Sequence, residues 1–258
     1  MNTVWALAKI VVLEMVRRKD FYVLFILTML LTLTAGSVNL FNDDRIVRYL
    51  KEICLLLIWV SALVIAITSA ARQIPAERES RTIFPLLAKP VTRAQFLVGK
   101  FLGCWLAVGL ALGVFYLFFG VVSAAREQHW PGVSYLQAAW LHWLMLGIVI
   151  AAALLGSLVF AAPSSNGTIC FVCAGGILLL GRHLNKVALQ LAEPAQSLLY
   201  AFYFVIPHLE LFDVRDRITH NLELIPWGIV ALATLYAAAY TAFFLFAAWL
   251  VFRRRPLN

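Results

Sequence analysis

The chain has 258 residues, of which 63% are hydrophobic and 13% are charged, and its formal net charge at pH 7 is +8. Soluble domains are nearer ~45–50% apolar and ~25% charged, so this composition excludes an ordinary soluble domain and indicates a membrane protein. The cations flank apolar runs and form no single soluble face, so we attribute the positive charge to membrane topology and expect no nucleic-acid partner.

The first 20 residues are predicted to form an amphipathic helix. Apolar residues at helical spacing, among them Val4, Ala8, Val11 and Met15, form one stripe, and most charges lie off it. Such a helix is typical of segments that lie on the cytoplasmic leaflet of a membrane. The alternative is a cytoplasmic extension of the first span. Charges run through to Asp20, so no cleavable signal peptide is predicted.

Six apolar runs are predicted to cross the membrane, because about 20 apolar residues in a helix span the hydrocarbon core. They are residues 21–41, 53–71, 101–125, 138–162, 168–181 and 226–252. The fifth run is short, at about 21 Å of helix. Lys and Arg near both termini place both ends in the cytoplasm, which requires an even number of spans. The predicted fold is therefore an all-α membrane protein with six transmembrane helices.

The segment 72–100 is too charged to enter the membrane, so it is predicted to be cytoplasmic. Pro75 suits the first turn of a helix, and Glu77 and Glu79 follow where a helix N-terminus favours acidic residues. An apolar cluster, residues 83–87, comes next. Such a cluster on the aqueous side of a membrane favours docking of a partner.

A second helix is predicted to begin at Thr92. Thr92 and Gln95 have the spacing of a capping box, and Pro90 helps to fix the break before it. We expect Arg93 and Lys100 to lie at the level of the lipid headgroups.

The longest connection is residues 182–223. A helical stripe interrupted at Pro194 predicts two short outer helices that re-enter the outer leaflet, followed by a polar loop, residues 209–221. An ordinary amphipathic loop is the alternative. The earlier connection, residues 163–167, contains proline and glycine and is predicted to be a tight turn.

Small and aromatic residues are predicted to pack and anchor the spans. Gly99, Gly103, Gly109 and Gly113 permit close helix contact in the third span. Tryptophans near the predicted membrane boundaries indicate an aromatic belt; they are Trp5, Trp130, Trp140, Trp143, Trp227 and Trp249.

The sequence predicts no catalytic residue, no metal site and no cofactor bound by this chain. The histidines lack metal-ligand spacing, and His142 is expected near the membrane surface. Cys170 and Cys173 are read as packing residues, because no second cysteine pair or flanking histidine accompanies them. An intramembrane enzyme is disfavoured by the scarcity of ionisable residues in the spans.

The 72–100 segment resembles the cytoplasmic loop of ABC-2 type exporter permeases. The resemblance rests on Glu77-x-Glu79, Thr82, the apolar cluster, Pro90, Arg93 and Gly99-Lys100, placed between a second and a third span. The outer motif at residues 207–213, PHLELFD, resembles the permeases of copper-site maturation and gliding-motility exporters. The resemblance implies a coupling helix that docks on a separate ATPase subunit through Glu77, Glu79, Arg81, Thr82, Phe84, Leu86 and Leu87.

The resemblance also implies a single permease domain over residues 1–258, a second permease copy as partner, ATP and magnesium in the ATPase partner, and a bacterial inner membrane. Two residues depart from the family pattern: Arg81 stands where glycine is usual, and Pro85 interrupts the coupling helix. A membrane scaffold that recruits another cytosolic partner through residues 72–100, without transport, is the alternative. The sequence does not indicate a substrate.

Overall fold

The computed structural model describes residues 3–17, 44–79, 91–127, 132–160, 162–220 and 222–254, with isolated positions 22, 26, 29, 30 and 33. All regular elements in these residues are helical, as predicted. They are α1 (Thr3–Arg17), α3 (Asp44–Glu79), α5 (Arg93–Glu127), α6 (Gly132–Val159), α7 (Pro163–Ala188), α8 (Ala195–Val205), the 3-10 helix η1 (Leu209–Phe212), α9 (Arg215–Thr219) and α10 (Trp227–Arg254).

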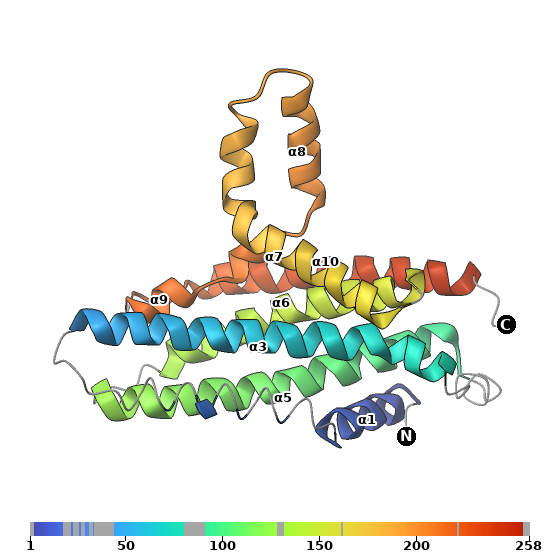
Figure 1. Ribbon diagram of the computed structural model, residues 1–258, viewed down its shortest axis with the longest axis horizontal. Coiled ribbons are helices and arrows are strands. Elements are labelled where there is room, and N and C mark those ends of the chain that lie inside the picture. Colours follow the sequence, from blue (N-terminus) through green and yellow to red (C-terminus); the bar gives the residue numbers. More distant parts are fainter. Residues whose placement is uncertain are drawn as a thin grey trace.

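The long helices form a bundle, with α3, α5 and α6 side by side and α10 packed along α6 (Figure 1). The end of α3, the start of α5, helix α1 and the end of α10 lie at one end of this bundle, which we call the α3–α5 end. Helix α9 and the start of α3 lie at the opposite end. Segments far apart in the sequence therefore meet where α3 ends and α5 begins.

Five helices in the described residues are long and apolar enough to cross a membrane, and α8 with the η1–α9 segment would make a sixth if that bent pair counts as one span. The five are Lys51–Glu79, Arg93–Ala124, Gly132–Val159, Pro163–Gly181 and Trp227–Arg254. They contain the cores of five predicted spans, which confirms a multi-pass membrane fold. The predicted span 21–41 lies outside the described residues, apart from isolated positions.

The prediction of a tight turn over residues 163–167 is wrong. These residues form the first turn of α7, which begins at Pro163 and runs for 26 residues. Proline is well suited to that position, because the first helical N–H groups have no partner within the helix. The connection is residues 160–162, and the fifth span is therefore longer than predicted.

The connection between α7 and α10, which was predicted to be an outer one, departs from the prediction in its first half. The first predicted outer helix is the continuation of α7 to Ala188, whereas α8 is a separate helix that follows Pro194, as predicted. Figure 1 shows the end of α7 and α8 standing out from the bundle as a hairpin. The predicted polar loop contains η1 and α9.

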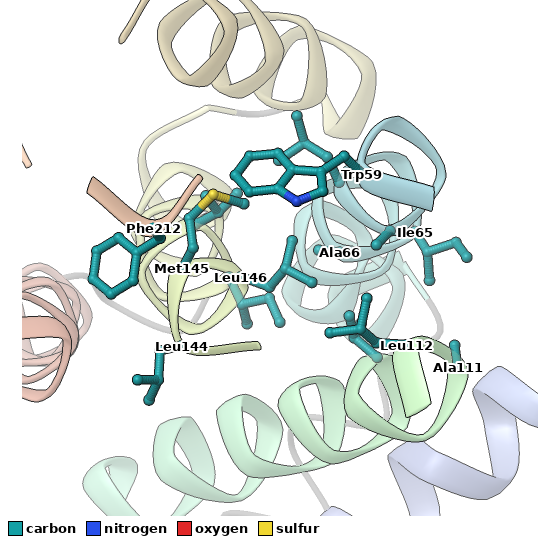
Figure 2. Close-up of a cluster of buried hydrophobic side chains, with 14 of the residues drawn as sticks. Trp59, Ile65, Ala66, Ala111, Leu112, Leu144, Met145, Leu146 and Phe212 are labelled. Atoms are coloured by element: carbon teal, nitrogen blue, oxygen red, sulfur yellow. The ribbon is translucent and has the colours of Figure 1, made fainter. Parts of the chain in front are cut away.

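The core lies where α3, α5 and α6 meet. Figure 2 shows Trp59 and Ala66 of α3, Leu112 of α5, and Met145 and Leu146 of α6 converging there, all buried. In a bilayer the hydrophobic effect does not drive helices together, so close packing of side chains holds such a bundle.

Two tryptophans fasten α5 to α6. The Trp105 indole N–H donates to the Trp143 carbonyl at 3.0 Å, and the Trp143 N–H donates to the Trp105 carbonyl at 2.9 Å. The rings stack at 4.2 Å between centroids. A Cβ on Gly109 would come within 2.5 Å of Trp143, and one on Gly147 within 3.0 Å of Trp105. We call these four residues the tryptophan clasp. Trp143, which was expected in the aromatic belt, therefore packs α5 against α6.

Helix α1 packs on α5 through two of the predicted glycines. A Cβ on Gly99 would lie 2.8 Å from the Leu7 Cβ, and one on Gly103 would lie 2.5 Å from the Val11 Cβ. Leu7 and Val11 are buried, together with Ala8 and Met15 of the predicted stripe. The apolar stripe of α1 therefore faces protein, while Trp5 on the same helix is exposed.

Candidate functional site

The residues predicted for ATPase coupling, and those predicted for the helix restart and headgroup anchoring, fall in two groups. Arg81, Thr82, Phe84, Leu86, Leu87 and Pro90 lie outside the described residues. The structure places the other six at the α3–α5 end, on the two helical stems of the 80–90 segment: Glu77 and Glu79 on α3, and Thr92, Arg93, Gln95 and Lys100 at the start of α5.

The stem on α3 differs from the prediction. Pro75 does not open a new helix; it lies inside α3, which continues to Glu79. Glu77 and Glu79 are therefore in the last turn of a helix and not in its first. Taken alone, a proline in this sequence predicts the first turn of a new helix. Ile74 and Pro75 are buried here, and their packing stabilises a continuous helix although the proline removes one backbone hydrogen bond.

A buried polar triad joins the two stems. The Lys100 ammonium of α5 forms an ion pair with Glu77 of α3 and donates to the Gln73 Oε1 atom at 3.1 Å. It also lies 5.7 Å from the centre of the Phe96 ring. Lys100 is only 2% exposed, so its side chain does not have the exposure expected of a headgroup anchor. Its burial requires a paired charge, which Glu77 supplies.

The stem on α5 begins with a capping box. The Thr92 N–H donates to the Gln95 Oε1 atom at 3.0 Å, and the Gln95 N–H donates to the Thr92 Oγ1 atom at 3.2 Å. These two bonds satisfy backbone donors that a helix N-terminus otherwise leaves without partners. The chain direction is therefore fixed where the 80–90 segment re-enters the bundle.

Arg93 links this stem to the end of α10. Its guanidinium donates to the carbonyl oxygens of Phe252 and, at 3.0 Å, Arg253. It lies 5.3 Å from the centre of the Phe252 ring. A cation at these carbonyls stabilises the negative end of the α10 dipole, so α5 and α10 are held together at their ends.

A small apolar cluster lies beneath these polar contacts and joins four helices. Its buried members come from α3, α5, α6 and α10, and they are Ile74, Phe96, Leu97, Leu158, Ala248 and Phe252. Because both stems contribute to this cluster, a displacement of either stem requires α6 and α10 to move or repack.

The PHLELFD motif, residues 207–213, ends in an ion pair at the opposite end of the bundle. Arg215 makes a two-pronged contact with Asp213, with both N···O distances 2.8 Å. Asp213 accepts these bonds and raises the pKa of Arg215, so the pair stays ionised. Arg215 also lies 5.1 Å from the centre of the Trp59 ring. The contact anchors α9 on α3.

His142, which was expected near the membrane surface, has its side chain inside the helix bundle. It is fully buried on α6 and stacks on Trp59 with 4.4 Å between ring centres. Neither ring nitrogen has a hydrogen-bond partner. In the described ranges, no group of three or more His, Cys, Asp or Glu residues could hold a metal ion.

Sequence reasoning missed Gln73 and Phe252 at the α3–α5 end, and Gln137 at the other. Gln137 Nε2 donates to the Ile225 carbonyl at 2.9 Å, and Gln137 Oε1 accepts from the Ile225 N–H at 3.1 Å, which fixes the entry to α10. Gln73 carried a signal, since it stands four residues before Glu77 on one helix face. Phe252 carried none.

The family model described as ABC-2 family transporter protein matches residues 2–255, which is nearly the whole chain. No curated protein matches the chain.

Proposed function

Since the chain belongs to the ABC-2 family of transporter proteins, we propose that it is the permease subunit of an ABC exporter, and that two permease copies work with a separate ATPase subunit. The observation that supports this most directly is the junction of the two stems. The 80–90 segment leaves from Glu79 and returns at Thr92. The Lys100 triad joins the two stems to each other, and Arg93 joins the second stem to the end of α10. The capping box defines where the second stem begins.

The proposed docking surface is the 80–90 segment with Glu77 and Glu79. Phe84, Leu86 and Leu87 supply apolar contacts, Arg81 and Thr82 supply polar ones, and Pro90 ends the segment before the helix restarts. Glu79 is exposed at the end of α3 and is available to a partner. The Glu77 side chain is 16% exposed and is paired with Lys100, so it offers less surface to a partner than Glu79.

In this proposal ATP and Mg²⁺ bind to the partner ATPase, and this chain hydrolyses nothing itself. The α3–α5 end faces the cytoplasm of a bacterial cell, both termini lie there, and the α7–α8 hairpin dips into the outer leaflet of the inner membrane. The positive-inside rule supports this orientation, because Lys and Arg concentrate near the two ends of the chain.

The test is purification of the native complex through a tag on this chain. We expect an ATPase to copurify, and Phe84→Asp or Leu87→Asp to reduce its recovery by roughly 30-fold, the effect of losing one apolar hot spot. Phe84→Leu and Leu87→Ile are the matched controls and should retain the ATPase. Recovery of a partner that does not hydrolyse ATP, or full recovery with both Asp variants, would contradict the proposal.

A further inference from the structure

Pro75 stands at the root of the 80–90 segment, one turn before α3 ends. It has no backbone N–H, so the Ala71 carbonyl receives no hydrogen bond from residue 75, and a proline inside a helix weakens the helix there. Sharp bends in helices occur mainly at such residues. The last turn of α3 is therefore joined to the rest of the helix by an incomplete set of backbone bonds.

Lys100 bridges this weak point from the neighbouring helix. Gln73 precedes Pro75 by two residues and Glu77 follows it by two, so both lie on one face of α3 on either side of the proline. The single ammonium of Lys100 holds both, by the ion pair with Glu77 and the 3.1 Å hydrogen bond to Gln73. A bend at Pro75 that separated Gln73 from Glu77 would break one of the two contacts.

Because the site is buried, Lys100 either keeps its contacts with Gln73 and Glu77 or loses them without replacement. Lys100 is 2% exposed and Gln73 is 4% exposed, so little water is present to replace a lost partner. Ile74, which follows Gln73 in the chain, is fully buried in the four-helix apolar cluster. A bend would have to displace both the charge pair and this packing together.

Lys100 also belongs to the second stem. It lies two turns into α5, which begins directly after the capping box at Thr92. Pro75 and Lys100 therefore lie on opposite stems of the 80–90 segment. A force on this segment acts on both stems.

We propose that Pro75 is a hinge at the root of the 80–90 segment and that Lys100, which binds both Gln73 and Glu77, is the lock that keeps this hinge from bending. The lock makes α3 and α5 move as one body, and its release lets the segment bend against α3. That this motion carries the ATPase signal rests on the proposed function; the hinge and its lock do not.

Hydrogen exchange of the isolated full-length chain in lipid nanodiscs tests the lock without any partner. We expect Lys100→Met to speed exchange of the 72–79 amides by roughly tenfold or more, because the end of α3 then opens locally. The core peptides of α6 should not change. Unchanged exchange at 72–79 would overturn the proposal, and so would equal acceleration throughout the bundle, which indicates general destabilisation.

A second variant separates a hinge from a merely stabilising ion pair. Pro75→Ala restores the missing backbone bond, so Lys100→Met in the Pro75→Ala background should lose most of its effect on the 72–79 amides. If Lys100→Met accelerated exchange equally in both backgrounds, the ion pair would stabilise α3 without reference to the proline, and the lock would be refuted.

The native complex then tests the link to transport. Wild-type and Lys100→Met chains should recover equal amounts of ATPase, but in the variant the hydrolysis rate should no longer respond to the permease. If no ATPase copurifies with the wild type, the proposed function fails. The exchange experiment still decides whether Lys100 restrains bending at Pro75. If hydrolysis in the variant matches the wild type, the lock has no part in coupling.

Discussion

At the scale of the single residue, Gly156 and Asn166 illustrate how a polar side chain is accommodated inside an apolar bundle. Asn166 is fully buried in the first turn of α7, and its Nδ2 donates to the Ala153 carbonyl of α6 at 2.9 Å. A Cβ on Gly156 would lie 2.0 Å from the Asn166 Oδ1 atom. The amide reaches α6 because residue 156 has no side chain.

Gly156→Ala should therefore destabilise the protein, by about 1–3 kcal/mol, since the added methyl group must displace a buried, hydrogen-bonded amide. The measurement is the unfolding midpoint in mild detergent. Gly113→Ala is the control, because a Cβ there would meet nothing within 4 Å. Gly156→Ala combined with Asn166→Ala should recover part of the loss. If the double variant lost more stability than the two single variants together, the clash between the new methyl group and the Asn166 amide would not be the cause.

At the scale of the element, the tryptophan clasp explains why α5 and α6 approach closely. Each helix contributes the same short pattern, W-L-x-x-G, at residues 105–109 and 143–147. Because the helices are antiparallel, each tryptophan lies over the glycine of the other helix and donates to the carbonyl of the other tryptophan. A pattern present twice in the chain thus encodes one reciprocal contact.

Gly109→Ala should weaken this contact, because the new Cβ would be placed 2.5 Å from the Trp143 indole nitrogen. We expect a loss of about 1–3 kcal/mol in unfolding free energy and a shift of tryptophan fluorescence as the stacked rings separate. Gly113→Ala, one turn further along α5, should be neutral or stabilising by about 0.5–1 kcal/mol, since it removes the flexibility of glycine. Equal effects at both positions would contradict the clasp.

Local signals in the sequence predicted some elements well and others wrongly. The capping-box spacing at Thr92 and the proline before α8 are both signals that act within one turn, and the structure contains a helix start at each. Pro75 and Pro163 carry similar local signals. Tertiary packing decides whether a helix continues through Pro75, and whether residues 163–167 form a turn or the start of a helix. Neither the burial around Pro75 nor the contact of Asn166 with α6 is visible in the sequence.

At the scale of the whole molecule, the composition and the apolar runs were sufficient to predict a multi-pass helical fold. The position of the candidate site followed from charges that cannot enter a membrane. The Lys100 triad could not be predicted in the same way, because it depends on the relative rotation of α3 and α5. Lys100 itself was expected at the surface, since a lone lysine at the end of a span usually reaches the headgroups.

Burial is distributed unevenly over the long helices. The most apolar windows of α3 and α6 are 67% and 72% buried, whereas those of α7 and α10 are 17% and 11% buried. Leu179 on α7 and Leu235 on α10 are exposed. Lipid covers apolar surface of this kind, and in the proposed dimer a second copy covers part of it.

The proposed dimer can be tested on this surface. In a background without the four cysteines, Leu235→Cys and Leu179→Cys should give cross-linked dimers with a bifunctional maleimide in native membranes. Leu117→Cys on α5 is the matched control: Leu117 is 66% exposed and Leu235 is 67% exposed, so both react equally with a single maleimide. Since α5 is half buried and α10 is almost uncovered, only the α7 and α10 positions should lie near the partner copy. Cross-linking of equal yield at Leu117 would place the second copy elsewhere, and monomers at all three positions would argue against the dimer.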